Sequence, residues 1–273
     1  MKQLQVIFRF YINSSIHVAI ATCSLVILTQ LKFGLPWDTT LLLFIFSGAI
    51  TGYNVVKYAS VSNLYHQRLT KSMRAIQIFT ALAIGSFVGS MFYINVHTLL
   101  FMIPVILLTG LYVLPIFPKG KSLRNIARVK IYIIALVWSI TTVIIPIEMA
   151  EKSFSFLGWV ETLQRFLLII VIMLPFEIRD LQYDDISLQT VPQLVGITNT
   201  KIFGSILMIL FLLLTLLKSN IQLHEMYSTL LITIVILFFL WNTRRKQSLY
   251  YCSFWVESVP LFWLLFYLVL NQT

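Results

Sequence analysis

The chain has 273 residues, of which 59% are hydrophobic and only 11% are charged. A typical soluble domain has roughly 25% charged residues, and so few charges cannot cover a soluble fold with this much apolar material to bury. The composition therefore excludes an ordinary soluble protein and predicts an integral membrane protein with several spans. The mean hydropathy of +0.88 agrees.

The net charge of +10 comes from 20 Lys and Arg against 10 Asp and Glu. In a soluble protein this excess would suggest a nucleic-acid partner. Cytoplasmic loops of membrane proteins also collect Lys and Arg, so we expect no nucleic-acid partner. The two cysteines, Cys23 and Cys252, lie in apolar runs, and we expect neither a disulfide framework nor a zinc site.

A transmembrane helix needs about 20 mostly apolar residues. Nine segments of the sequence meet this requirement, so we expect an all-α bundle of nine transmembrane helices. The loops between them are short, which predicts a single integral-membrane domain over residues 1–273. The predicted spans are 14–32, 39–58, 74–94, 97–116, 129–147, 160–178, 200–218, 226–242 and 252–270.

The Lys and Arg residues predict the orientation of this bundle. If the N-terminus is cytoplasmic, sixteen of the 20 lie on the cytoplasmic side and four on the other. Enrichment on the cytoplasmic side is the general rule. We therefore expect a cytoplasmic N-terminus and an external C-terminus, in a multi-pass protein of the bacterial cell membrane.

Acidic residues gather after the sixth predicted span. Glu177, Asp180, Asp184 and Asp185 lie within nine positions of one another. If the helix continues through them, the first three share one face, because they recur at intervals of three and four. Like charges on one face repel, and carboxylates that act with substrate phosphates are typical Mg²⁺ ligands. The alternative is a solvated acidic loop without a ligand.

The acidic segment resembles a known motif. The pattern Glu-Ile-Arg-Asp-x-x-x-Asp from Glu177, followed by Thr-x-Pro-x-x-x-Gly from Thr190, resembles the second aspartate motif of the UbiA superfamily of intramembrane prenyltransferases. The resemblance implies nine helices, a cytoplasmic N-terminus and acidic motifs after helices two and six. Two departures are that Glu177 replaces the usual Asp and that the gap before Thr190 is one residue short.

The first aspartate motif of that family is degenerate in this chain. The family pattern after the second helix is Asn-Asp-x-x-Asp-x-x-x-Asp, followed by basic residues. Asn54 matches, whereas Val55, Tyr58 and Ser62 stand at the three acidic positions. An alternative for Asn54 is a helix-packing amide that bonds to neighbouring spans.

The resemblance implies a role for each candidate residue. Asp180 and Asp184 are the predicted catalytic residues, and with Glu177 they are the predicted ligands of an Mg²⁺ cofactor. Positive-inside topology alone is the alternative for the basic residues, and Lys57 has the further alternative of reaching to the membrane interface. The predicted contacts to substrate diphosphate are Asn54, Lys57, Arg68, Lys71, Lys121 and Arg124.

Glu257 lies inside the ninth predicted span. An ionisable group there is costly and usually faces a cavity or a charged partner. The resemblance does not assign a role to it.

The function implied is transfer of a prenyl group from an allylic (poly)prenyl diphosphate to a lipophilic or aromatic acceptor. The partners are then these two substrates and membrane lipid. One alternative is a non-catalytic homologue that binds a prenyl lipid or quinone, because the first motif is degenerate. Another is a transporter, although transporter sites lie near mid-bilayer and these acids lie at the membrane edge.

Overall fold

The computed structural model describes residues 2–58, 71–114, 122–123, 126, 128–218 and 222–272. Within these ranges the chain is helical and contains no strand, which confirms the predicted all-α class. The predicted contact residues Arg68, Lys121 and Arg124 lie outside the described residues, as does the side chain of Lys71. The helices are α1 (Lys2–Asn13), α2 (Ile16–Lys32), α3 (Thr39–Tyr58), α4 (Lys71–Met91), α5 (Val96–Val113), α6 (Lys130–Ser139), η4 (Ile140–Ile144), α7 (Ile145–Met149), α8 (Phe156–Asp180), η5 (Ile186–Leu188), α9 (Val191–Thr215), α10 (Leu223–Asn242), η6 (Tyr251–Val256) and α11 (Val259–Asn271).

Eight helical stretches of the described residues are long and apolar enough to cross a membrane, and a bent pair of helices makes a possible ninth. The bent pair is α1 and α2, which meet at an angle of 56°. Ser15 sits at the bend with a positive φ of 62°, and the hydroxyl of Ser14 donates to the carbonyl oxygen of Phe10. The predicted bundle of nine apolar helices matches this architecture.

Two of the spans contain a π-helical turn. In one, η4 joins α6 to α7, and in the other η6 precedes α11. π-Helical turns are uncommon and occur often at functional sites. The turn η6 ends one residue before Glu257, the ionisable residue of the last span.

The helix ends differ most from expectation around α9. This helix begins at Val191 rather than at residue 200. Pro192 suits the first turn, because its fixed φ is helical and its missing N–H would have no helical partner there. Gly196 then breaks the helix with a φ of 81°, and the polar residues around it hid this first part of α9 from a hydropathy count.

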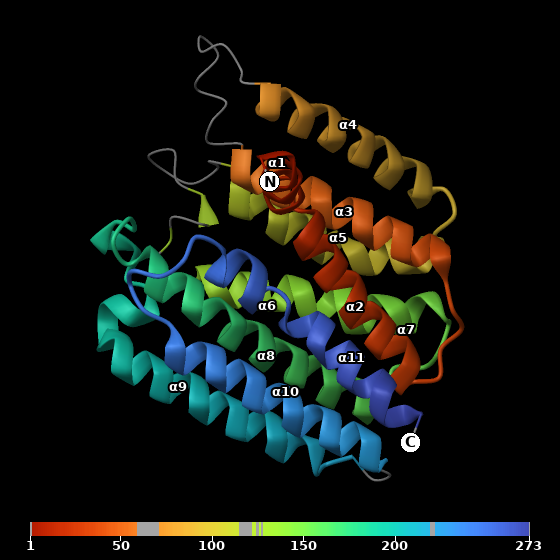
Figure 1. Ribbon diagram of the computed structural model, residues 1–273. Coiled ribbons are helices and arrows are strands. Elements are labelled where there is room, and N and C mark those ends of the chain that lie inside the picture. Colours follow the sequence, from red (N-terminus) through yellow and green to blue (C-terminus); the bar gives the residue numbers. More distant parts are fainter. Residues whose placement is uncertain are drawn as a thin grey trace.

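Successive spans run in opposite directions, so their connections alternate between two ends of the bundle (Figure 1). We call the end where α8 stops and α9 starts the aspartate end, and the opposite end, where α2 stops and α8 starts, the far end. The helix α8 is the most buried of the eight spans and packs against α6 and α9, whereas α4 is the least buried. The main core lies around α8.

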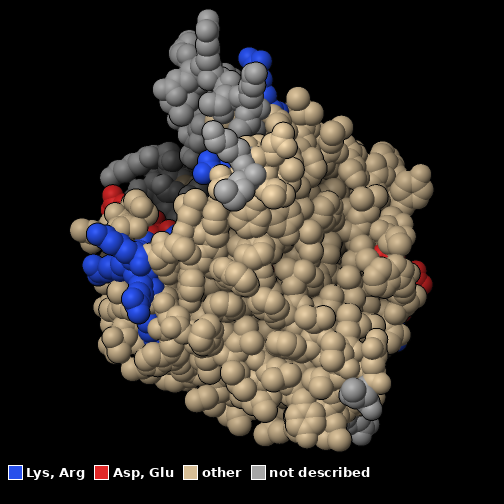
Figure 2. Space-filling view, viewed as in Figure 1, with Lys and Arg blue, Asp and Glu red and all other residues tan. Residues whose placement is uncertain are grey.

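The outer surface is that of a membrane protein. Figure 2 shows uncharged residues over most of one face, with Lys and Arg gathered at one edge. Large apolar side chains are exposed on the outer helices, including Leu82, Ile206, Ile209, Phe238 and Leu265. Exposed apolar area on this scale marks contact with lipid. The aspartate end remains the predicted cytoplasmic end.

Candidate functional site

The acidic segment straddles the end of α8. The helix stops at Asp180, so it does not continue to Asp184 as the one-face arrangement requires. The backbone N–H groups of Tyr183 and Asp184 both donate to the carbonyl oxygen of Asp180, each at 2.8 Å. Asp184 therefore lies in a turn that folds back against the helix end.

Asp180 is held by its neighbour in the chain. The Nε of Arg179 donates to Oδ1 of Asp180 at 2.7 Å, and Nη2 donates to Oδ2 at 3.1 Å. Such two-pronged pairs of a guanidinium and a carboxylate are among the stronger polar contacts in proteins. The guanidinium also lies over the ring of Phe176, with its carbon 5.2 Å from the ring centroid. Both oxygens of Asp180 are thus engaged.

Glu177 is almost fully buried and faces the start of α9. Its Oε2 accepts a hydrogen bond from the backbone N–H of Val191 at 3.3 Å. The first N–H groups of a helix have no partner inside it and carry partial positive charge, so a carboxylate is favourable there. Nearby, Gln193 accepts from Thr190 N–H at 2.8 Å and donates to the carbonyl oxygen of Asp185 at 3.1 Å. These bonds tie the acidic turn to α9.

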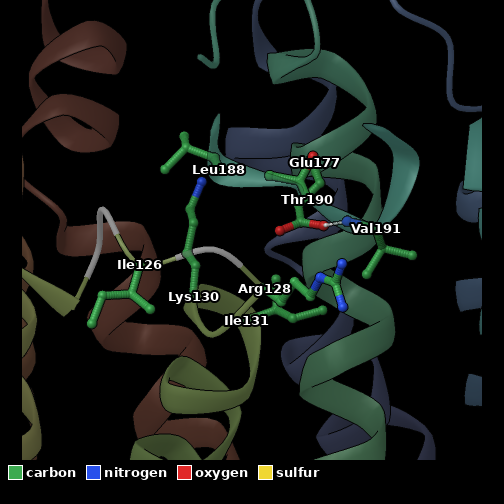
Figure 3. Close-up of a pocket in the computed structure, with 8 residues that line it drawn as sticks. All are labelled: Ile126, Arg128, Lys130, Ile131, Glu177, Leu188, Thr190 and Val191. Carbon is green, nitrogen blue, oxygen red and sulfur yellow. Dashed lines mark hydrogen bonds between the residues drawn. The ribbon is translucent and has the colours of Figure 1, made fainter. Parts of the chain in front are cut away.

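A small pocket lies beside Glu177 (Figure 3). Its volume is about 10 Å³, which is about what one water molecule needs. Glu177 and Lys130 enter it from different elements, and Lys130 Nζ lies 3.9 Å from Oδ2 of Asp184. Among charged residues, Lys130 also interacts most strongly with Glu177. The pocket is lined by Ile126, Arg128, Lys130, Ile131, Glu177, Leu188, Thr190 and Val191.

Two residues at the rim of this pocket have a strained backbone. Arg128 and Gln189 have φ values of 69° and 45°, in the left-handed region that favours glycine. They hold each other: Arg128 Nε donates to Oε1 of Gln189 at 3.1 Å, and Arg128 N–H donates to the carbonyl oxygen of Leu188 at 3.1 Å. Strained residues of this kind cluster at functional sites, which supports this end of the bundle as the candidate site.

The predicted magnesium ligands do not form a three-carboxylate site. Among the described residues, no three His, Cys, Asp or Glu side chains converge in a way that suits a metal ion. Glu177 accepts from a backbone N–H, Asp180 pairs with Arg179, and Asp184 faces Lys130. The residues present therefore do not fit a resident Mg²⁺ held by these three acids.

Asn54 is buried and satisfied by protein groups. Its Oδ1 accepts from the hydroxyl of Ser15 at 2.8 Å. Its Nδ2 donates to the carbonyl oxygen of Ser14 at 3.1 Å and to the hydroxyl of Thr80 at 2.8 Å. These are the contacts of a helix-packing amide, which joins α3 to the bend before α2 and to α4. A bond to diphosphate would have to replace one of them.

Lys57 and Glu257 lie near each other at the aspartate end. Lys57 Nζ donates to the carbonyl oxygen of Asn13 at 3.2 Å, at the end of α1. Glu257 is half-buried and interacts electrostatically with Lys57 and with Arg179. No hydrogen bond or ion pair to its carboxylate occurs among the described residues. Glu257 is therefore an acid that interacts electrostatically with a cation of α3 and a cation of α8 but has no direct partner among the described residues.

The far end holds a buried charge cluster that the sequence analysis missed. Glu161 is fully buried and accepts from Lys32 at 3.0 Å, Arg165 at 3.1 Å and Lys218 at 2.8 Å. Glu225 accepts from Lys218 at 2.6 Å and lies 3.4 Å from Lys32. Hydropathy windows average such charges away. The spacing of Glu161 and Arg165, four residues apart inside one span, was the available signal.

This far-end charge cluster joins α2, α8, the residues after α9, α10 and α11. Arg165 donates to the carbonyl oxygen of Leu25 at 3.1 Å and lies over the ring of Trp263, with its carbon 5.3 Å from the ring centroid. Lys218 lies outside the spans. Burial lowers its pKa, but the carboxylates of Glu161 and Glu225 outweigh burial and raise the pKa above its ordinary value. Lys218 is thus a cation of the cluster.

No protein-family model matches the sequence, and no curated protein sequence matches it significantly. Solved structures do match. The apo structure of a UbiA homologue from Aeropyrum pernix K1 aligns with a TM-score of 0.66 at 14% identity, over 94% of this chain and 99% of that chain. A UbiA homologue from Archaeoglobus fulgidus bound to Cd²⁺ gives 0.60 at 13% identity, over 96% and 100%. A digeranylgeranylglyceryl phosphate synthase gives 0.59 at 14% identity, over 98% of each chain.

Each alignment covers almost the whole of both chains. At 13–14% sequence identity, this likeness shows a shared fold. The protein is therefore an integral membrane protein with the fold of the UbiA homologues, which confirms the fold predicted from its sequence.

Proposed function

We propose that the protein is a UbiA-like intramembrane prenyltransferase. It moves a prenyl group from an allylic (poly)prenyl diphosphate to a lipophilic or aromatic acceptor. The allylic C–O bond breaks, diphosphate leaves with the electron pair, and the acceptor bonds to the allylic carbon and loses a proton. The apolar interior of the bundle keeps water away from the cationic carbon. The bacterial cell membrane is the proposed location.

One observation carries the proposal. A full-length UbiA-like fold places the acidic turn, two cations and a pair of strained residues together at one end. Charged groups and strained backbone collected around one small pocket are expected of an active site. The distant transporter alternative lacks such support, because these charges lie at a helix end.

The chain's own residues bind and orient the diphosphate in this proposal. Asp180 and Asp184 remain the proposed active-site acids, and they hold Arg179 and Lys130 at the aspartate end. Cations suit phosphate oxygens, so these two groups are available to the leaving diphosphate. The other proposed diphosphate contacts are those predicted from the sequence: Asn54, Lys57, Arg68, Lys71, Lys121 and Arg124.

Magnesium is the cofactor that the resemblance implies, and a Cd²⁺-bound UbiA homologue is among the structural matches. The carboxylates of this chain are arranged otherwise, as described above. The proposed reaction therefore does not depend on a metal ion held by these three carboxylates.

A non-catalytic homologue that binds a prenyl lipid or quinone is the second candidate. The contacts of α3 favour it. The amide of Asn54 makes three protein hydrogen bonds, Tyr58 donates its hydroxyl to the carbonyl oxygen of Asn13 at 3.0 Å, and Val55 is exposed. Of the motif positions that the structure describes, Asn54 and Tyr58 thus bond to neighbouring protein groups and Val55 faces outward, while Ser62 lies outside the described residues.

Release of diphosphate separates the two candidates. The purified protein in lipid nanodiscs is given radiolabelled geranyl, farnesyl or geranylgeranyl diphosphate with a lipid extract as the source of acceptor. We expect release of diphosphate together with a prenylated product found by mass spectrometry. Asp180→Asn removes the charge that holds Arg179 and should reduce the rate, whereas Lys246→Met, at an exposed residue of the same end, should not.

Donor binding without release would favour the non-catalytic candidate. Absence of binding for every donor would contradict both. Lipid that co-purifies with the protein, identified by extraction and mass spectrometry, gives the prenyl chain length independently of turnover.

A further inference from the structure

The geometry points to Lys130 and Arg179 as tethered cations that occupy the carboxylates where a metal ion would otherwise bind. The acidic segment of this protein is then an internal ion-pair cluster that does not need a resident divalent ion. The effect of this ion-pair cluster on diphosphate binding rests on the proposed function. The pairing itself is a property of the protein alone and is tested separately.

Asp180 is already paired within the protein. Both of its oxygens accept from the guanidinium of Arg179, at 2.7 and 3.1 Å. A metal ion would have to displace a charge-assisted pair whose two members are adjacent in the chain. The ring of Phe176 holds the guanidinium from its other side. Arg179 is therefore positioned by two contacts at once.

Lys130, the first residue of α6, lies beside the other acids of the predicted metal set. Its Nζ lies 3.9 Å from Oδ2 of Asp184, and it is the charged residue that interacts most strongly with Glu177. That oxygen of Asp184 is buried and has no hydrogen-bond donor among the described residues. The lysine thus faces two carboxylates of the predicted metal set, in the position expected of a counter-ion.

The acids of this segment and their neighbouring cations nearly balance in charge. Glu177, Asp180 and Asp184 bring three negative charges, and Lys130 and Arg179 bring two positive ones. The partial positive charge of the α9 N-terminus at Val191 offsets part of the third. The degenerate first motif adds no acid, since uncharged residues stand at its three acidic positions. The site is close to neutral without a divalent ion, so the drive to recruit one is weak.

Mn²⁺ binding to the purified protein tests this inference without any substrate. Mn²⁺ shares the oxygen ligands of Mg²⁺, and the loss of its free electron-paramagnetic-resonance signal measures binding directly. We expect wild-type protein to bind no more Mn²⁺ than Asp184→Asn does. Lys130→Met frees Asp184 and Glu177, so its Mn²⁺ affinity should exceed that of wild type by about tenfold or more.

Lys246→Met is the matched control, because it removes an exposed lysine at the same end of the bundle. It should bind Mn²⁺ as wild type does. Elution as a single species from a sizing column shows that each variant is folded. Wild-type Mn²⁺ binding that disappears in Asp180→Asn or Asp184→Asn would overturn the inference. Failure of Lys130→Met to gain affinity would overturn it as well.

Binding of farnesyl diphosphate, measured with and without EDTA, connects the inference to function. We expect EDTA to weaken this binding less than Lys130→Met does, since a tethered cation cannot be chelated. A stronger effect of EDTA than of Lys130→Met would overturn the inference. If farnesyl diphosphate does not bind at all while the Mn²⁺ results hold, the proposed function fails and the ion-pair cluster stands.

Discussion

Replacement of Glu161 by Gln tests the far-end charge cluster. The side chain of Glu161 is fully buried and accepts from three cations, Lys32, Arg165 and Lys218, at 2.8–3.1 Å. Glutamine keeps the shape and one acceptor oxygen but removes the charge. The cluster then has three cations and one carboxylate, that of Glu225, in place of a near balance.

Removal of one partner of a buried ion pair costs about 3–5 kcal/mol, because the other charge is left uncompensated. Three cations share Glu161, and Glu225 compensates two of them in part. We therefore expect the loss in the free energy of unfolding to fall within that range. For a chain of this size each kcal/mol lowers the melting temperature by about 2–4 °C. The apparent melting temperature should therefore fall by about 6 °C or more.

The assay is thermal unfolding of the purified protein in one detergent, followed by the fraction that stays monodisperse. Glu151→Gln is the matched control, since Glu151 is exposed at the same end and should change stability by less than about 0.5 kcal/mol. A second variant, Glu161→Gln with Lys218→Met, restores the charge balance and should be more stable than the sum of its single changes predicts. Equal melting of Glu161→Gln and Glu151→Gln would refute the reasoning.

Three further predictions concern the aspartate end. Asn54→Leu should destabilise the protein by about 1–3 kcal/mol, because it leaves buried partners unsatisfied; unchanged melting with weaker diphosphate binding would instead support the predicted diphosphate contact. Glu257→Gln should change the rate of diphosphate release while the melting temperature stays within about 2 °C, since no hydrogen bond is lost; an unchanged rate would assign Glu257 no part in turnover. Reporter fusions at Asp185 and Lys246 should both give a cytoplasmic signal, and an external signal at either would reverse the orientation.

The fold could be predicted from the sequence because each membrane span is a run of about 20 mostly apolar residues, which a hydropathy average detects. Nine apolar segments joined by short loops are compatible with few arrangements of membrane helices. The breaks at Ser15 and Gly196 do not change the order of these helices. Helix ends were harder. The first part of α9 depends on Pro192 in its opening turn and on one backbone N–H capped by Glu177. Contacts of that kind form only after the chain has folded.

The candidate site was predicted only in part. The sequence spacing alone predicted that Glu177, Asp180 and Asp184 lie near one end of α8. It could not show which group each carboxylate contacts. Arg179 sits beside Asp180 in the sequence, yet the sequence does not say whether the two side chains meet. Lys130 begins α6, next to basic residues that positive-inside topology explains equally well. The pairing needed the helix packing that places α6 next to α8.

At both ends of the bundle, carboxylates are paired with cations, but the pairs differ in burial and in contact distance. At the far end, two carboxylates and three cations lie within direct contact, and Glu161 and Arg165 are fully buried. A ligand that displaced one member of this cluster would leave another charge unpaired in a low-dielectric interior. Ligand binding that breaks the cluster is therefore unfavourable. At the aspartate end, the pairs are partly exposed and the Lys130–Asp184 contact is long. A diphosphate could therefore take Lys130 from Asp184 at a smaller cost than it could take a cation from the far-end charge cluster, which supports the aspartate end as the proposed binding site of an anionic substrate.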